Sequence, residues 1–277
     1  MTNADAPVVP GSIAAQGWFS ANPDKAWVEK FFLAYSPVWM ASMGLVMLLG
    51  GHASWSDGAL LVHALLTAAP ALLIPLWIAS RRPAAQRLPW HQSYWFKANL
   101  YLFVFGFFGN YIGSEYFFEV LGMVYVFPNA TTTFDSALVG RGEQTVPLIM
   151  YGYTHVYFMT YHASANLVLR RVMRAGKVWL FPVAVLAVGY AWAWAETKAM
   201  ANPMMAENFY YRDIPRMLAV GSAIYATYFV ASFPFWYALD ERPERRWSVL
   251  ETLGAALSAS MLTLYLLELA AQLVGTI

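Results

Sequence analysis

The sequence predicts an all-α, polytopic membrane protein with about seven transmembrane helices. Apolar residues make up 59% of the 277 residues and charged residues only 12%, which is about half of the charged share in soluble domains. The apolar residues are gathered in long runs, and the mean hydropathy is +0.46. The runs lack the strict alternation of membrane β-strands, so helices that satisfy their own backbone hydrogen bonds are expected.

Each apolar run is long enough to cross a hydrocarbon core, which takes roughly 20 helical residues. The runs are 31–50, 59–79, 98–123, 147–169, 178–200, 216–238 and 249–274. Before the first run, Asn22 and Pro23 are typical of a helix N-cap followed by proline at the first helical position. Aromatic residues around them suit a helix at the membrane interface. We therefore expect one membrane domain over residues 1–277, with residues 1–30 as an interfacial segment.

Basic residues are divided unequally between alternate connections. Thirteen of the 17 Lys and Arg residues fall on the side of the N-terminus. The four on the opposite side are Arg141, Lys198, Arg212 and Arg216. Because positive charge is retained in the cytoplasm, we expect a cytoplasmic N-terminus and an outer C-terminus. Residues 124–146 and 200–216 are then outer loops, and a re-entrant or interfacial helix within 115–146 would change the number of spans.

Charge and cysteine content exclude several classes of function. The net charge is +1 and the basic residues flank the spans rather than forming one patch, so no nucleic-acid partner is indicated. The chain has no Cys, which excludes disulfides and thiol chemistry. The first 30 residues lack the pattern of a cleaved signal peptide.

Ionisable groups inside spans are costly and are therefore functional candidates. In the fourth span, Tyr151, His155, His162 and Asn166 follow each other at spacings of four, seven and four residues, which places them on one helix face. Two interpretations of this face stay open. It binds and transforms a ligand, or it makes structural hydrogen bonds to neighbouring helices.

Other polar candidates fall in the outer halves of the spans. They are Asn110, Glu115 and Glu119 in the third span, Glu196 in the fifth and Asp213 at the start of the sixth. At 1.5 Å per residue, His155 lies roughly 12 Å below the outer end of the fourth span. These groups could therefore meet in one outer cavity, with His162 deeper. Glu115 and Glu119 also suit interfacial charges, and Glu268 in the seventh span stands alone.

Several familiar chemistries lack their motifs. The seventh span has no Lys for a retinal Schiff base, and the five His residues do not form the clusters of a di-iron desaturase. No GxGxxG, Walker or GxSxG motif occurs. His155 and His162 could ligate haems, but a second matched pair of His residues is missing.

Long segments spread along the chain resemble a known family. They are WFSANPDKAWVEKFFLAYSPVW at 18–39, YWFKANL at 94–100, GNYIGSEYFFEVLGMVYVFP at 109–128, THVYFMTYHASANLVLRR at 154–171, AETKAMAN at 195–202 and YATYFVASFPFWYALDE at 225–241. In order and spacing they resemble the cycloeucalenol cycloisomerases, sterol-pathway enzymes of plants with relatives in some bacteria and protists. The match covers roughly 80% of the chain by eye. The Ala-rich composition indicates a bacterial member in the inner membrane, and a eukaryotic member would lie in the endoplasmic reticulum.

The resemblance implies a reaction and a set of residues. The family opens the 9β,19-cyclopropane ring of a sterol such as cycloeucalenol and forms a Δ8 sterol, obtusifoliol, as an intramolecular lyase without metal or redox cofactor. The implied partners are a cyclopropyl sterol and membrane lipids, and no protein partner. His155, His162, Glu196, Asn110 and Asp213 match family positions. The family pattern has a His at the position of Glu115 and a Lys or small residue at that of Glu119, so neither Glu is implied to be essential.

The implied chemistry needs an acid for the cyclopropane methylene, a dry environment for the cation and a base for a ring proton. A carboxyl buried in apolar surroundings stays protonated at pH 7, and an imidazolium is a stronger but less populated acid. We expect Glu196 paired with His155, sharing one proton, with His162 as relay or orienting group. Which group is the acid stays open. The expected substrate-binding residues are Asn110, Tyr111, Glu115, Tyr116, Tyr151, Trp192 and Asp213.

Two other functions remain as alternatives to the enzyme. A sterol or lipid carrier would have the same apolar cavity without proton chemistry, so replacing Glu196 or His155 would change affinity alone. A haem-binding membrane subunit would give the purified protein a Soret band. The resemblance over most of the chain favours the enzyme over both.

Overall fold

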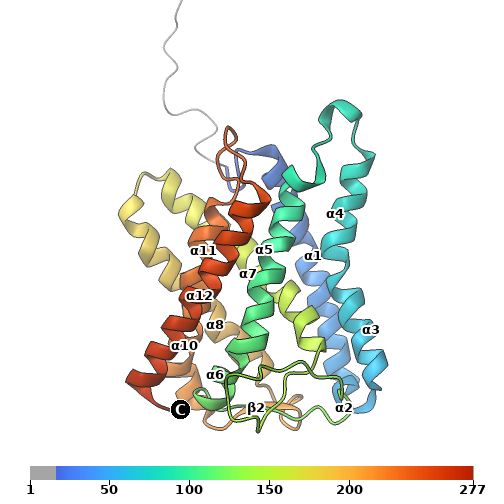
Figure 1. Cartoon of the computed structure of the whole chain (residues 1–277), viewed down its shortest axis with the longest axis vertical. Helices are drawn as coiled ribbons and strands as arrows, with labels where there is room; N and C mark the ends of the chain where they lie inside the picture. The colour runs from blue at the N-terminus through green and yellow to red at the C-terminus, as the bar shows by residue number, and fades with distance from the viewer. Residues whose placement is uncertain (1–16, 277) are drawn as a thin grey trace, which may run out of the picture.

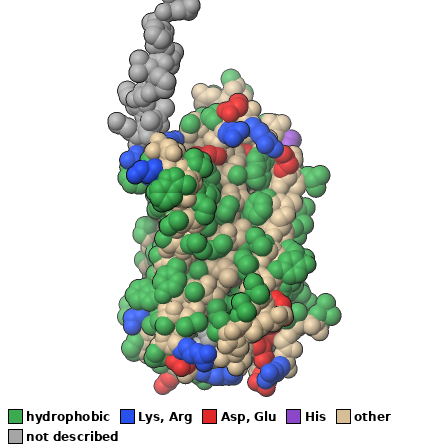
Figure 2. Space-filling model, turned by 90° about the vertical axis from the view of Figure 1, so that its left-hand side faces the viewer, with side chains coloured by type: hydrophobic (Ala, Val, Ile, Leu, Met, Phe, Trp, Pro, Cys, Tyr) green, Lys and Arg blue, Asp and Glu red, His purple; other side chains and the backbone are tan. Residues whose placement is uncertain are grey.

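The computed structural model describes residues 17–276, which form a bundle of helices running along the long axis of the molecule (Figure 1). The connections that follow α4 (Pro70–Arg81), α7 (Ile149–Arg174) and α11 (Thr227–Ala238) gather at the end where residue 17 lies. The described C-terminal residues lie at the opposite end. In Figure 2, hydrophobic side chains cover the middle of the visible face, and charged side chains gather toward both ends.

Five helical segments of residues 17–276 are long and apolar enough to span a membrane, as expected for a multi-pass membrane protein. They are α1 (Pro23–Leu48), Asp57–Arg81 with α3 (Asp57–Ala68) and α4, Val178–Met200 with η5 (Val178–Leu180) and α8 (Phe181–Met200), Ile214–Ala238, and α12 (Val249–Val274). Ile214–Ala238 is divided into α9 (Ile214–Arg216), the π-helical η6 (Met217–Gly221), α10 (Ser222–Tyr225) and α11.

The two other expected spans are helical but more polar. Residues 98–123 correspond to α5 (Tyr94–Phe108), the π-helical turn η4 (Gly109–Gly113) and α6 (Ser114–Glu119), and residues 147–169 correspond to α7. Both lie inside the bundle, since α7 contacts α1, α3, α5, α8 and α11. Half of the residues of α7 are buried. Helices surrounded by protein can carry polar residues that a lipid-facing helix cannot, which explains why these two do not reach the hydropathy of the other five.

The structure contains a small two-stranded sheet that the sequence did not predict. Strand β1 (Met123–Tyr125) pairs antiparallel with β2 (Phe209–Tyr211), so that Met123 faces Tyr211 and Tyr125 faces Phe209. Strand β1 lies at the start of the loop expected at 124–146, and β2 lies within the loop expected at 200–216. The sheet joins these loops at the end of the bundle that holds the described C-terminal residues (Figure 1). The remaining short helices are α2 (Gly51–Ser54), η2 (Ala84–Gln86) and η3 (Trp90–Gln92).

The N-terminal helix begins where the sequence predicts it. The Asn22 side chain accepts a hydrogen bond from the backbone N–H of Asp24, and Pro23 occupies the first helical position. Of the segment expected to lie at the interface, residues 1–16 lie outside the described residues. Residues 23–30 are the first turns of α1, which continues to Leu48 without interruption. The expected boundary at residue 30 is therefore not a break in the helix.

Candidate active site

A pocket of about 110 Å³ lies between η4, α7, α8 and α10. Strands β1 and β2 contribute Met123, Tyr125, Phe209 and Tyr211 to its wall. Most of its other lining residues are aromatic or methionine, so the space is largely apolar. Its polar lining residues other than tyrosines are His52, Asn110, Ser114, Thr154 and Glu196. A few polar groups in an otherwise apolar pocket are typical of a small-molecule site.

Glu196 supplies the carboxyl group of this pocket. It lies one turn from the end of α8, and its carboxyl accepts a hydrogen bond from the hydroxyl of Tyr225, with Tyr161 close by. The ion pairs found within residues 17–276 all involve other carboxylates. Glu196 therefore faces the pocket without a basic partner, surrounded by phenol groups.

His155 lies on a different face of α7 from the pocket. Its Nε2 is 2.8 Å from Oδ1 of Asn99, whose amide nitrogen donates to the carbonyls of Trp95 and Ala71. Within residues 17–276, His155 shares no hydrogen bond with Glu196. The expected pair of these residues therefore does not form in this structure, because the side chain of His155 turns toward α5 and not toward α8.

His162 is fully buried, two turns farther along α7. Its Nδ1 is 2.7 Å from the carbonyl of Phe158, so this nitrogen carries the hydrogen, and Nε2 accepts from the hydroxyl of Ser232 at 2.8 Å. Farther along the same face, Asn166 donates to Glu29 at 2.8 Å. The polar residues of α7 thus make hydrogen bonds to different neighbouring helices: His155 to α5, His162 to α11 and Asn166 to α1. These contacts favour the structural interpretation for His162 and Asn166.

The expected substrate-binding residues divide into two groups. Asn110 lines the pocket, where its Oδ1 accepts from Thr154 at 3.2 Å and its Nδ2 donates to Gly106 at 2.8 Å. Trp192 lies one layer behind, with its ring 4.5 Å from that of Tyr161.

The three expected substrate-binding tyrosines lie outside the pocket lining. Tyr111 stacks on Phe107, and Tyr151 donates to the carbonyl of Phe134 at 2.7 Å. Tyr116 donates to Glu268 at 2.9 Å.

The acidic candidates outside Glu196 have local structural partners. Glu115 is buried and packs against Gly140, where an added side chain would overlap its carboxylate. Glu119 pairs with Arg141 at 3.1 Å near the protein surface. Asp213 caps α9 by accepting from the backbone N–H of Arg216 at 3.0 Å. No group of three or more His, Cys, Asp or Glu side chains suited to a metal ion occurs in the described residues.

Comparison with known proteins identifies the family. Over 277 aligned residues the chain is 35% identical to the cycloeucalenol cycloisomerase of Arabidopsis thaliana, and the alignment covers 96% of this chain and 92% of the plant protein. The chain belongs to the cycloeucalenol cycloisomerase family. This membership confirms the resemblance seen in the sequence and makes the chain an isomerase. No family model matches it, and no solved structure does.

This cycloisomerase family member has pocket residues that the sequence did not single out. Tyr225 and Tyr228 occur in the resembling segment YATYFVAS, three residues apart, and both line the pocket. His52 lies in α2, just after α1, and it is 3% exposed and lines the same pocket. A run of tyrosines inside an apolar span was a usable signal, whereas nothing local indicated His52.

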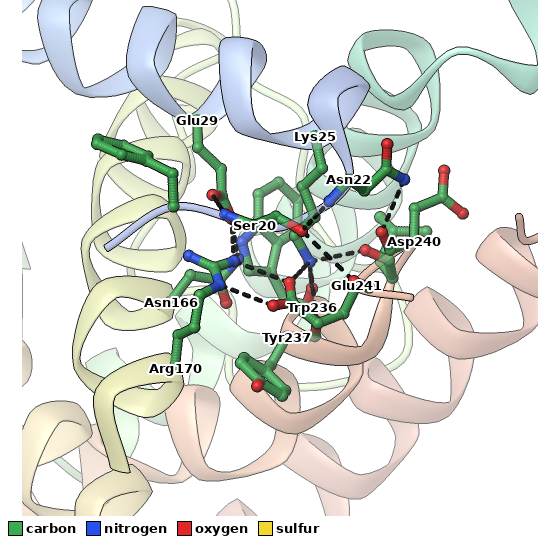
Figure 3. A network of polar contacts seen from close by, with 12 residues as sticks. Ser20, Asn22, Lys25, Glu29, Asn166, Arg170, Trp236, Tyr237, Asp240 and Glu241 are labelled. Atoms are coloured by element: carbon green, nitrogen blue, oxygen red, sulfur yellow. Dashed lines mark hydrogen bonds and ion pairs between the residues drawn. The ribbon is translucent and has the colours of Figure 1, made fainter. Parts of the chain in front are cut away.

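A second polar cluster lies outside the pocket lining, at the end of the bundle where residue 17 lies (Figure 3). Arg170 of α7 bonds Glu29 at 2.7 Å and Glu241 at 2.7 Å, and Lys25 lies 3.1 Å from Glu241. Lys25 also donates to the backbone carbonyls of Trp236, Tyr237 and Leu239 at the end of α11.

The charge of Glu241 is fixed by these partners. Burial opposes ionisation of its carboxyl, but the hydrogen bonds from Arg170 and the charge of Lys25 outweigh burial and hold its pKa below the ordinary value. The sequence placed these basic residues among the flanking charges of the cytoplasmic side. In the structure they are buried and paired, so this cluster ties α1, α7 and α11 together.

Proposed function

We propose that the chain opens the 9β,19-cyclopropane ring of a cycloeucalenol-type sterol and forms a Δ8 sterol such as obtusifoliol. The proposal is supported by the 35% identity to a cycloeucalenol cycloisomerase over nearly the whole chain. It is also supported by a pocket that places one carboxyl group among apolar and aromatic side chains. The carboxyl of Glu196 is the observation on which the mechanism rests.

The reaction moves one proton onto the sterol and one proton off it. The Glu196 carboxyl gives its proton to the cyclopropane methylene, the C9–C19 bond breaks, and C19 becomes a methyl group. The positive charge then rests on C9. Loss of the proton from C8 forms the C8–C9 double bond, and the Glu196 carboxylate is the base that regains this proton, directly or through the hydroxyl of Tyr225. The reaction is an isomerisation, so no electrons are exchanged with a cofactor.

The rest of the pocket protects the cation. Aromatic faces stabilise a positive charge within about 6 Å, and Phe117, Tyr157, Phe158 and Tyr228 line the pocket. The apolar wall limits water, which would otherwise capture the cation. We assign His155 and His162 to positioning, because His155 anchors α7 to α5 through Asn99, and His162 anchors α7 to α11 through Ser232.

The decisive experiment compares the reconstituted wild type with Glu196→Gln. Wild type should convert cycloeucalenol to obtusifoliol, as seen by mass spectrometry, and in deuterated water one deuterium should appear in the new methyl group. Glu196→Gln should lose at least about 100-fold in kcat, the lower range of general acid catalysis. Glu268→Gln is the matched control, because this carboxyl lies on α12 outside the pocket.

Three outcomes contradict the proposal. Wild type that converts none of several cyclopropyl sterols is not this enzyme. Binding of these sterols without conversion would instead support the sterol carrier. Full activity of Glu196→Gln would remove Glu196 from the mechanism.

We also propose that the chain crosses the bilayer seven times with a cytoplasmic N-terminus. In addition to the five long apolar helices, α5 to α6 and α7 each run between the same two ends of the bundle (Figure 1). The excess of basic residues at the connections on the N-terminal side supports this orientation. A bacterial inner membrane is the location we propose for the chain.

A further inference from the structure

An apolar cleft of about 290 Å³ separates α12 from α5 and η4. One wall consists of Phe105, Phe108, Gly109, Ile112 and Gly113, and the other of Leu257, Ser260, Met261, Thr263, Leu264 and Leu267. The hydroxyls of Ser260 and Thr263 donate to carbonyls within α12, both at 2.8 Å. Their hydrogen-bonding capacity is thereby used inside the helix, so the cleft presents hydrocarbon surface.

The cleft adjoins the candidate active site. Gly109 and Tyr228 line both spaces. The ring of Tyr228 stands between them, 5.7 Å from the ring of Tyr225, which bonds Glu196. Its hydroxyl donates a hydrogen bond to the carbonyl of Gly109 at 3.2 Å. At Gly113 an added Cβ would overlap this hydroxyl, so the turn η4 needs glycine there to make room for Tyr228.

The pocket around Glu196 is too small to hold a whole sterol without the adjoining cleft. Sites for drug-sized ligands measure roughly 300–1,000 Å³, and the pocket around Glu196 measures about 110 Å³. A pentacyclic sterol with a side chain does not fit there alone. The cleft adds about 290 Å³ of apolar space. It also borders the lipid-facing side of α12, where Met261 is 51% exposed.

We propose that this cleft is the apolar half of the substrate site, in which the hydrocarbon side chain of the sterol lies against α12. This inference rests on the proposed function. The reacting rings occupy the pocket beside Glu196, and the ring of Tyr228 turns to let the molecule span both spaces. The sterol enters sideways from the lipid, between α12 and η4. An acyl chain of a membrane lipid and a second copy of this chain are the other occupants that the experiment distinguishes.

The test fills the cleft and varies the length of the substrate. Leu264→Trp occupies cleft volume, and Leu262→Trp is the matched control on an exposed part of α12 that does not line the cleft. For a cyclopropyl sterol with its full side chain, Leu264→Trp should raise KM at least about tenfold with little change in kcat, since lost hydrocarbon burial weakens substrate and transition state alike. For an analogue without the side chain, Leu264→Trp and wild type should have similar KM.

Outcomes that overturn the inference are equally direct. Equal losses for both substrates, or an equal effect of Leu262→Trp, mean that the side chain does not lie in the cleft. So does an unchanged KM of Leu264→Trp for the sterol with its full side chain.

A binding readout separates this inference from the proposed function. A sterol with a diazirine in its side chain should label peptides containing residues 257–267, and Leu264→Trp should abolish this labelling. Labelling without any turnover would reject the enzyme and keep the cleft as a sterol site. Turnover with labelling elsewhere would keep the enzyme and reject the cleft, as would displacement of the probe by phospholipid alone or labelling only in a dimer.

Discussion

The carboxyl of Glu196 accepts a hydrogen bond from Tyr225 on α10, and Tyr161 on α7 lies close by. A phenol that donates to a carboxylate stabilises the charge left after proton transfer, and a hydrogen bond to a charged group contributes about 1.5–3 kcal/mol. This arrangement differs from the shared proton of a carboxyl and an imidazole that the sequence suggested.

Tyr225→Phe should lower kcat by about 10- to 100-fold, because the Glu196 carboxylate loses one donor. Sterol binding should change little, since the ring is retained. Tyr190→Phe is the matched control, because the Tyr190 hydroxyl bonds the backbone carbonyl of Leu218 outside the pocket. Turnover and binding of a fluorescent sterol measure the two effects separately. Unchanged kcat in Tyr225→Phe would mean that this hydroxyl takes no part in the reaction.

His52 gives a prediction on pH. Burial, reinforced by the charge of nearby His63, lowers the pKa of His52 to about 4. In the unfolded chain its pKa is about 6.5, so below that pH the unfolded state takes up a proton that the folded state does not. The contribution of neutral His52 is complete above pH 6.5 and is lost as the pH falls toward 4, by about 3 kcal/mol.

Thermal unfolding in detergent checks this effect. Wild type should lose more stability than His52→Asn between pH 6.5 and pH 4, and the two should run parallel above pH 7. If both proteins follow the same pH curve throughout, His52 is not buried in its neutral form.

At the scale of elements, the loop between α11 and α12 is held by a buried ion pair. Lys97 of α5 pairs with Asp240, and both side chains are fully buried. Asp240 also accepts from the backbone N–H of Trp247 at 2.7 Å, while Lys97 donates to the carbonyl of Trp247 at 2.9 Å. Asp240 has a φ of 50°, a conformation that Asn adopts as readily as Asp.

Asp240→Asn should therefore destabilise the protein by about 3–5 kcal/mol, because the Lys97 charge stays buried without its partner. The backbone at residue 240 should not add to this loss, since Asn adopts its conformation as readily as Asp. Glu119→Gln, at the more exposed pair with Arg141, should change stability by no more than about 1 kcal/mol. Unfolding in detergent measures both. Equal effects of the two substitutions would mean that burial adds nothing to the Lys97 pair.

The sequence could predict where a helix begins and which residues share a helix face. The start of α1 at Pro23 depends on neighbouring residues, and the polar face of α7 depends on helical periodicity. The partners of that face were not predictable in the same way. Asn99 lies 56 residues from His155, and Ser232 lies 70 residues from His162. Contacts over such separations depend on how helices pack, and periodicity holds no information about them.

At the scale of the whole molecule, hydropathy is high in the five outer helical segments and lower in the two central ones, α5 to α6 and α7. The most polar of the seven expected spans, α7, is the one that most other helices surround. The pocket also depends on the sheet of β1 and β2, which pairs two strands more than 80 residues apart in the sequence and was not expected. Composition and family resemblance therefore gave the class of protein and the carboxyl of the site, but not the tyrosines around it.

The proposed topology can be tested with single cysteines, because the chain has no Cys. Cysteine in place of Glu143 or Glu207 should react with a membrane-impermeant maleimide in intact cells. Cysteine in place of Gln86 or Glu244 should react only after the membrane is opened. All four positions are exposed in the structure. Labelling of both groups from the same side would rule out the proposed seven crossings.

The cluster around Lys25 and Glu29 has a consequence for how the protein is made. These charges lie on α1, whereas Arg170 follows about 140 residues later and Glu241 about 70 residues after that. At a synthesis rate of 5–20 residues per second, Arg170 and Glu241 are made on the order of ten seconds or more after Lys25 and Glu29. The ion pairs that join α1 to α7 and to the end of α11 therefore form only late in synthesis, after Arg170 and Glu241 have been made.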